Sequence, residues 1–494
     1  MAPEGDYAVA MRVRQVWLTH AILLAGAGLR LGLTIAWPPE LAYDDHYEPI
    51  EVILKRGQIP SAGDCWQCYQ PPLYYLISAA GCIATQGLAG RFGVDQAGLE
   101  QVGRRTLQAV SLAAGCATLY LCRSIFRRVP TLAAHEPLAL ALIAFLPRHI
   151  YMSAMATNDA LTYFMASAAV CAALRAGAAG WPVRGTLFAG ALAGAGALSK
   201  AYGWVSVIAI LASVWLISLA ARRRQTADRP PAGSGRPAAR SPLLLLAASA
   251  LAVGIWPTVR NLWIYDEIHV DNYALRDTPL RFQPPGSVRQ TSFFSFRLGA
   301  LMENPWVHMA HADSFWTALY ARLWFDYEGF NTTQGRYPAW QELWRRAEEA
   351  HPVWNRARWE MLLNYRPDQV PSAFRRTAQV SFVAGLAPTA AVLVGALFAL
   401  RRLGRELPTT LLVIHLGGAW FVPLYQTLRL PHFAAMKAAF ALSAISSAPV
   451  LAGLVLNAIP AGWCRHVMGI VLWLSVLTIA GADCAFVWFQ FGLR

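Results

Sequence analysis

The chain has 494 residues, of which 56% are hydrophobic and only 14% are charged, and its mean hydropathy is +0.36. This composition excludes an ordinary soluble domain, which needs more surface charge, and predicts a polytopic α-helical membrane protein. The net charge of +14 comes from Lys and Arg in short loops between apolar runs. That pattern is typical of membrane topology signals and lacks any nucleic-acid-binding motif, so we expect no nucleic-acid partner.

Apolar runs long enough to cross a hydrocarbon core of about 30 Å recur along the chain. The run at 16–37 has no small-residue cleavage site beside it, so we interpret it as a retained anchor rather than a signal peptide. Further spans are predicted at 106–124, 137–153, 160–178, 185–199, 202–220, 242–259, 379–400, 408–427, 432–457 and 466–490. The expected fold class is therefore an all-α bundle of about eleven transmembrane helices.

Basic residues flank alternate gaps between these runs. Placing those gaps in the cytoplasm, as the positive-inside rule requires, puts 38–105, 260–378 and the C-terminus outside. A complete crossing by 71–87 would invert every later loop. We therefore predict that "PPLYYLISAAGCIATQG" is an interfacial or re-entrant helix that begins at its two prolines, which a first helical turn tolerates.

This topology divides the chain into four parts. Residues 1–265 form the main transmembrane module, with 38–105 as its first outer loop. Residues 222–241 are rich in Pro, Gly and Arg and are predicted to be a flexible cytoplasmic linker. Residues 260–378 carry eight tryptophans, which a disordered segment would lack, so we expect a small helical cap on the outer face. Residues 379–494 supply the C-terminal transmembrane helices.

Two adjacent carboxylates, Asp44 and Asp45, follow the first span in "YDDHYEPI", with His46 and Glu48 beside them. Solvated loop acids, or N-caps of the amphipathic helix that follows, are the simplest interpretation of the pair. The alternative is that the acids belong to a site at the point where the chain leaves the membrane.

The same loop contains "DCWQCY". One Cys-x-x-Cys lacks the four ligands of a structural zinc site. In an extracytoplasmic loop a Cys65–Cys68 disulfide is the better interpretation, with free thiols or a metal as alternatives. The other six cysteines lie in or beside apolar runs and are expected to be small buried residues.

Ionisable residues collect at the outer ends of the predicted spans. Charge near lipid is costly to bury, so such residues often mark a site. A carboxylate can act as a general base, and cations bind phosphate, so the mixture predicts a site for an anionic, lipid-linked substrate. The residues concerned are Asp44, Asp45, His46, Glu48, Arg104, Arg105, Arg148, His149, Asp159, Lys200, Arg260, Arg429, His432 and Lys437.

Several of these residues also have purely structural interpretations. Asp159 would serve as the N-cap of the span that it opens, and Lys200 would extend its ammonium to the membrane interface. Arg104 and Arg105 would bind lipid headgroups without specificity. The remaining three would be interfacial anchors: Arg429, His432 and Lys437.

Motifs spread over residues 16–265 resemble those of the GT-C glycosyltransferases, in particular the branch of protein O-mannosyltransferases and the lipid A aminoarabinose transferase. They are "YDDHYEPI", "QPPLYYLI", "LPRHIYMSAMATNDALTYF", "AGALAGAGALSKAYGW" and "GIWPTVRNLWIYDE", in that order. The sequence departs from the usual pattern at two places: Asp45 replaces a Glu, and Gln70 replaces a His.

The resemblance implies a sugar donor on a polyprenyl phosphate, an unknown hydroxyl acceptor and inverting displacement at the outer face of a bacterial inner membrane. It implies catalytic roles for Asp44, Asp45 and Asp159, and donor-phosphate binding by Lys200, Arg260, Arg429, Arg104 and Arg105. Co-location at the outer ends of the spans, rather than the resemblance, adds five residues that we expect to line the site: His46, Glu48, His149, His432 and Lys437. No cofactor is expected, although the carboxylates leave Mg²⁺ or Mn²⁺ open as an alternative.

Three other functions compete with this interpretation. A transporter or flippase of a lipid-linked or anionic solute also needs charges, but its site would lie near the bilayer midplane between repeats, and no repeat is visible. A lipid-linked glycan ligase or polymerase would share the long outer loop but not explain the acid pair. The third alternative is a non-catalytic scaffold built around the tryptophan-rich segment.

Overall fold

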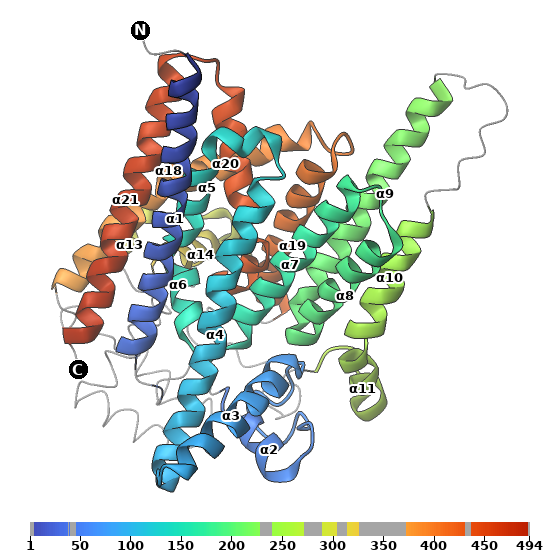
Figure 1. Ribbon diagram of the computed structural model, residues 1–494, viewed down its shortest axis with the longest axis vertical. Helices are drawn as coiled ribbons and strands as arrows, with labels where there is room; N and C mark the ends of the chain where they lie inside the picture. Colours follow the sequence, from blue (N-terminus) through green and yellow to red (C-terminus); the bar gives the residue numbers. More distant parts are fainter. Residues whose placement is uncertain are drawn as a thin grey trace.

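The computed structural model describes residues 4–37, 39, 46–227, 240–270, 289–303, 314–325, 372–429 and 436–492. Every regular element within these residues is helical (Figure 1). The long helices are α1 (Glu4–Ala36), α3 (Leu73–Arg91), α4 (Gln96–Phe126), α7 (Asn158–Ala178), α8 (Val183–Ser199), α9 (Trp204–Ala227), α18 (Ser372–Leu400), α19 (Leu407–Arg429) and α21 (Trp463–Gly492).

Shorter helices connect and break these rods. They are α2 (Glu48–Arg56), η3 (Pro130–His135), α5 (Glu136–Ala144), α6 (Pro147–Ala154), η4 (Ala201–Gly203), α10 (Arg240–Gly254), α11 (Trp256–Tyr265), η5 (Gln290–Phe294), α13 (Leu298–Glu303), α14 (Phe315–Trp324), η9 (Ala438–Ala444) and α20 (Ser447–Ala458). The protein is thus a helical, polytopic membrane protein, as its composition predicts.

Seven described helices are long and apolar enough to cross a membrane, or up to ten if three bent pairs each count as one span. The pairs are α5 with α6, α10 with α11, and η9 with α20, bent by 54°, 53° and 67°. The predicted span at 185–199 corresponds to α8, whose 17 residues leave it outside this set. The expected number of about eleven spans is therefore not confirmed.

Glycines let α8 pack very closely against α10. A Cβ atom at Gly190 would lie 2.5 Å from the carbonyl oxygen of Leu246, and one at Gly194 would lie 2.4 Å from that of Ala250. Side chains larger than hydrogen would push the two backbones apart. This is the small-residue packing that joins helices where no hydrophobic effect does so.

Among the seven candidate spans, α7 is the most enclosed. In the apolar 18-residue stretch of α7, 78% of the residues are buried, against 28–44% in the corresponding stretches of the other six helices. It packs against α4, α8, α9 and η9. Any polar side chain on α7 is therefore surrounded by protein on most sides, which makes its partners informative.

The first outer loop folds into α2, α3 and the beginning of α4. Figure 1 shows α2, α3 and α11 at the end of the bundle opposite the N-terminus. Helix α3 begins directly after Pro72, as the double proline predicts. It is not among the seven described helices that are long and apolar enough to cross a membrane. A disulfide joins Cys65 to Cys68, with 5.0 Å between the two Cα atoms.

The tryptophan-rich segment contributes α14 to the interior of the bundle. Phe315, Leu319 and Tyr320 of this helix are buried, and α14 packs against α6, α18 and η9. Its Arg322 is also fully buried and donates a hydrogen bond from Nη1 to the carbonyl oxygen of Met436 at 2.6 Å. Much of the predicted cap, at 271–288, 304–313 and 326–371, lies outside the described residues.

Candidate functional site

A buried ion pair lies where α7 begins and α8 ends. Asp159 is 1% exposed and Lys200 is 8% exposed, and Lys200 Nζ lies 2.9 Å from Asp159 Oδ1. Tyr202 donates a hydrogen bond to the same oxygen, and Thr157 Oγ1 donates to Oδ2 at 2.9 Å. Three donors around one carboxylate compensate for its removal from water, so the arrangement suits an ionised Asp159.

The sequence around each partner explains how the pair is formed. Thr157 is the N-cap of α7, and its hydroxyl accepts a hydrogen bond from the Asp159 backbone N–H at 3.3 Å. Asn158 Nδ2 reaches across to the carbonyl oxygen of Ser199 at 3.3 Å, which joins the start of α7 to the end of α8. Lys200 then adopts an extended conformation, with φ −159° and ψ 145°, which ends α8.

His46 brings the first outer loop to this ion pair. It is 1% exposed, and its Nδ1 lies 2.8 Å from the Tyr75 hydroxyl. Its ring stacks on Tyr75 with centroids 5.9 Å apart and meets the edge of Tyr74 at 6.3 Å. His46 is close enough to Asp159 for the two to interact electrostatically. The start of α3, which "PPL" opens, is thus one wall of the site.

The helix η9 forms a second wall. Lys200 Nζ lies 5.6 Å from the centroid of the Tyr202 ring and 5.8 Å from that of Phe440, within the range of cation–π attraction. Tyr163 of α7 donates a hydrogen bond to the carbonyl oxygen of Ala439 at 2.8 Å. Lys437, the residue just before η9, therefore lies in the same region of the bundle.

His149 of α6 lies beside this cluster and is bound from behind by Arg30. Both side chains are fully buried, and Arg30 Nη2 lies 2.6 Å from His149 Nδ1. The imidazole ring also packs against the ring of Tyr163, with centroids 5.9 Å apart. Arg30 also donates to the carbonyl oxygens of Gly26 and Ala144, at 2.7 and 2.8 Å, so it fixes the break between α5 and α6.

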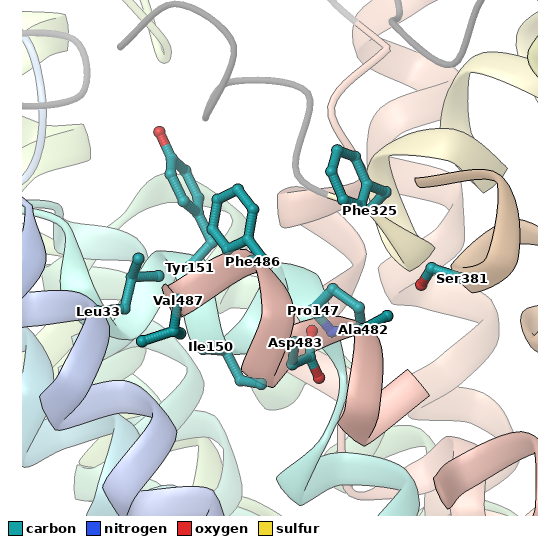
Figure 2. Close-up of a pocket in the computed structure, with 10 residues that line it drawn as sticks. All are labelled: Leu33, Pro147, Ile150, Tyr151, Phe325, Ser381, Ala482, Asp483, Phe486 and Val487. Atoms are coloured by element: carbon teal, nitrogen blue, oxygen red, sulfur yellow. The ribbon is translucent and has the colours of Figure 1, made fainter. Parts of the chain in front are cut away.

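Asp483 of α21 supplies opposite charge near Arg30. Figure 2 shows Asp483 in a small cavity with Leu33, Pro147, Ile150, Tyr151, Phe325, Ser381, Ala482, Phe486 and Val487. Asp483 is 6% exposed, its Oδ2 has no hydrogen-bond partner among the described residues, and it interacts electrostatically with Arg30. The space suffices for about one water molecule, which would satisfy the carboxylate.

Other predicted residues have partners that hold the first outer loop in place. Arg260 donates from Nη2 to the carbonyl oxygen of Pro60 at 2.8 Å and lies 5.6 Å from the ring centroid of Trp256. Glu48 Oε2 accepts the backbone N–H of Trp66 at 2.9 Å, next to the disulfide. Both side chains therefore act on the loop that follows the acid pair.

Arg104 and Arg105 leave the start of α4 in different directions. Arg104 lies 3.0 Å from Glu100, four residues earlier on the same helix. Arg105 Nη1 donates to the carbonyl oxygens of Thr34 and Trp37, each at 2.8 Å. Arg105 thereby binds the end of α1, from which the chain continues toward the two acids.

The structure thus brings together Asp159, Lys200 and His46, with His149 behind Tyr163. Asp44, Asp45 and His432 lie outside the described residues, and Arg429 is the last residue of α19.

Two structural interpretations from the sequence are wrong. The N-cap of α7 is Thr157, not Asp159, because the Asp159 carboxylate accepts from Lys200 and two hydroxyls instead. Lys200 is buried in an ion pair rather than extended to the membrane interface, because Asp159 offers its ammonium a charged partner within the protein.

No group of three or more His, Cys, Asp or Glu side chains within the described ranges is arranged to hold a metal ion. The alternative of a metal ion involved four carboxylates, of which Asp44 and Asp45 are not within those ranges. The third, Glu48, accepts a backbone N–H, and the fourth, Asp159, is bound to Lys200.

Sequence reasoning missed the residues that surround the ion pair. Thr157 and Tyr202 stand within the motifs "MATND" and "SKAYGW", next to the acid and the lysine that were selected. Their polar character, two positions from each of these charges, marked both as candidate members of the site but did not indicate their hydrogen-bond partners. Arg30 and Asp483 had a different signal in the sequence, because each is a charged residue inside a predicted apolar span.

Comparison with protein-family models and with curated proteins gave no match. Among solved structures, the chain is similar to the oligosaccharyltransferase of Archaeoglobus fulgidus in its apo form. The TM-score is 0.48 and the identity 16%, over 95% of this chain and 56% of that one. The same enzyme, AglB, with an inhibitory peptide and a dolichol-phosphate gives 0.47 and 16%, over 97% and 56%. The chain thus spans little more than half of the archaeal enzyme's length.

A second similar structure is ArnT from Cupriavidus metallidurans bound to undecaprenyl phosphate. Its TM-score is 0.34 and its identity 12%, over 87% of this chain and 78% of that one. At such scores the similarity says nothing about individual residues, so the chemistry of the site rests on its own geometry.

Proposed function

We propose that the protein transfers a sugar from a polyprenyl-phosphate donor to an acceptor hydroxyl, on the extracytoplasmic side of a bacterial inner membrane. The observation that carries the proposal is the buried cluster of Asp159, Lys200 and Tyr202, which His46 connects to the first outer loop. Burial of an ion pair inside an apolar bundle costs free energy, and charged residues in such a position usually serve a function.

Lys200 is the cation that we assign to the donor phosphate. Its ammonium has three N–H donors, and the hydrogen bond to Asp159 uses one. Asp159 and the rings of Tyr202 and Phe440 fix its position before a ligand arrives. A charge held in place within a low-dielectric site stabilises the negative charge that develops on the departing phosphate, which is usually a large contribution to catalysis.

Asp44 is the general base in this proposal. It stands two residues before His46, whose buried ring interacts electrostatically with Asp159. The acceptor oxygen attacks the anomeric carbon from the face opposite the phosphate, and Asp44 takes the acceptor proton. The bond from the anomeric carbon to the phosphate oxygen breaks, its electron pair leaves with the lipid phosphate, and the configuration inverts.

The remaining predicted residues are assigned supporting roles. Arg429 and Lys437, at the end of α19 and the start of η9, add positive charge toward the donor phosphate. Arg260, Arg104 and Arg105 act through the outer loop and the end of α1.

Metal dependence is a separate part of the proposal. We propose that fixed cations, not Mg²⁺ or Mn²⁺, balance the phosphate charge. Activity after treatment with EDTA, with and without added Mg²⁺ or Mn²⁺, tests this assignment. Activity that disappears with EDTA and returns with either ion would overturn it.

The test of function is transfer of radiolabelled sugar from a panel of bacterial polyprenyl-phosphate sugars by the full chain in lipid nanodiscs. Asp44→Asn should abolish transfer while donor binding remains, because the proton acceptor is lost. Asp159→Asn should reduce transfer strongly, because Lys200 loses its partner. Glu51→Gln, the equivalent change at a partly exposed acid of this loop, is the matched control and should leave transfer unchanged.

The outcomes separate the competing functions. Transfer unaffected by Asp44→Asn and Asp159→Asn would remove this site from the reaction. No transfer and no donor binding across the panel would favour the transporter or the scaffold instead.

A further inference from the structure

The imidazole of His149 is held on one edge and has no partner on the other. Its Nδ1 lies 2.6 Å from Arg30 Nη2, while its Nε2 is buried without a hydrogen-bond partner in the part of the chain that the structure describes. A buried polar atom without a partner costs about 1–3 kcal/mol. Such an atom calls for a partner that arrives from elsewhere, either a water molecule or a ligand.

Arg30 determines which ring nitrogen of His149 carries the proton. A guanidinium has only donors and does not lose its proton in proteins, so His149 Nδ1 must be the acceptor in the contact between them. In a neutral imidazole the proton is then on Nε2, and the doubly protonated ring is excluded because it has no acceptor to offer Arg30. His149 therefore presents an Nε2–H donor.

The arrangement behind the ring makes this donor suited to an anion. Arg30 is a fully buried cation that donates to Nδ1, and hydrogen bonds in series polarise one another, so the Nε2–H becomes a stronger donor. A carbonyl-bound, buried Arg30 cannot swing away to release the ring. The ring itself faces Tyr163.

Tyr163 and Tyr202 connect His149 to the ion pair that binds phosphate in the proposed function. Tyr163, against which the ring packs, interacts with Tyr202, the phenol that donates to Asp159. The same Tyr163 binds η9, which carries Phe440 beside Lys200. Two aromatic side chains, Tyr163 and Tyr202, therefore lie between His149 and Lys200 along this series of contacts.

We infer that His149 is a ligand-binding residue whose Nε2–H, set in its tautomer by Arg30, donates to a phosphate oxygen of a lipid phosphate. The choice of phosphate rests on the proposed function, whereas the tautomer does not. His149 binds the ligand in this inference, and Arg30 is a positioning residue that acts through it.

The tautomer is measured first, in the full chain without ligand. Protein labelled with ¹⁵N-histidine in nanodiscs is compared with the His149→Gln variant, which identifies the His149 signals. The expected spectrum has a protonated Nε2 and an unprotonated Nδ1 that persist at low pH, because Arg30 blocks the second proton. A protonated Nδ1 would overturn the inference whatever the protein's activity is.

The ligand is measured second, with undecaprenyl phosphate and with undecaprenol, which has the same chain and no phosphate. A hydrogen bond to a charged group is worth roughly tenfold to a hundredfold in affinity. His149→Phe should weaken binding of the phosphate by that factor and leave undecaprenol binding unchanged. His149→Gln, which keeps an N–H donor, should recover part of the loss, and His466→Phe at the exposed end of α21 is the matched control.

The two failures are distinguishable. If the wild-type protein binds undecaprenyl phosphate no better than undecaprenol, the proposed function fails, and so does the choice of phosphate. If the wild-type protein prefers the phosphate and His149→Phe binds it equally well, the inference alone fails, and a buried water is the partner of Nε2. A His149 Nε2 signal that shifts with the phosphate but not with undecaprenol supports it.

Discussion

Replacement of Lys200 by Met should destabilise the protein through the charge that it leaves behind. Asp159 is 1% exposed, so water cannot solvate its carboxylate once the ammonium at 2.9 Å is gone. Removal of one partner of a buried ion pair costs about 3–5 kcal/mol. Tyr202 and Thr157 still donate to the carboxylate, so we expect the lower end, about 3 kcal/mol in the free energy of unfolding.

The double variant Asp159→Asn/Lys200→Met isolates this cause. Without either charge, the buried site contains only neutral groups, and we expect a stability within about 1 kcal/mol of the wild type, since neutral replacement of a whole buried pair is often tolerated. Lys55→Met, which breaks an exposed pair with Glu51 at 3.5 Å, is the matched control and should change little.

The assay is unfolding in a mild detergent followed by circular dichroism, with refolding checked for each variant. The single variant at Lys200 should unfold well before the double variant, although the double variant carries more substitutions. Equal stability of the two would refute the reasoning, because it would mean that the Asp159 carboxylate does not need the ammonium. Neither variant should transfer sugar, which keeps the stability result independent of the activity result.

Three further predictions concern regions away from the ion pair. Gly194→Ala should lower the free energy of unfolding by about 1–3 kcal/mol, because its Cβ would meet a backbone oxygen at 2.4 Å. Gly417→Ala should leave the free energy of unfolding unchanged, because there is open space around its Cβ position. Thermal unfolding of both variants checks this prediction. Arg260→Gln should speed hydrogen exchange in residues 57–70, because the contact with Pro60 is lost. The backbone N–H of Ser61, and then Arg56, lower the pKa of Asp64. Asp64 therefore stabilises the outer loop above about pH 4, and this stabilisation is lost as the pH falls through the folded-state pKa. Hydrogen exchange of the wild type and of Asp64→Asn between pH 3 and 6 should differ only at the higher pH.

The membrane class and most helices could be predicted from sequence because both depend on local composition. Long apolar runs must be helical in lipid, and Pro71 and Pro72 mark a helix start wherever they stand. The span count is less secure because it depends on packing: α8 is short and rich in glycine, and its contact with α10 decides its place rather than its own hydropathy.

The site was predictable only in part, for a related reason. Asp159 and Lys200 are 41 residues apart, and their position at opposite ends of consecutive antiparallel spans placed them at one membrane level. That argument cannot choose a rotamer or a partner. Nothing local indicates that Tyr202 donates to Asp159, or that Arg30 is bound to His149 across 119 residues. Such contacts belong to the packed bundle and require its structure.

The buried cations of this bundle differ in what binds them, and the difference bears on function. The buried Arg322 and Arg30 donate to backbone carbonyl oxygens, and so does the half-buried Arg105. A guanidinium on carbonyls closes the end or the break of a helix, and its removal would leave those carbonyls unsatisfied. Lys200 instead has a carboxylate and two aromatic rings around an ammonium, whose other donors no backbone group takes up among the described residues. A lysine held in this way serves no helix end, and a ligand oxygen would complete its coordination. If one of these four cations receives a phosphate, the geometry favours Lys200 over Arg322, Arg30 and Arg105.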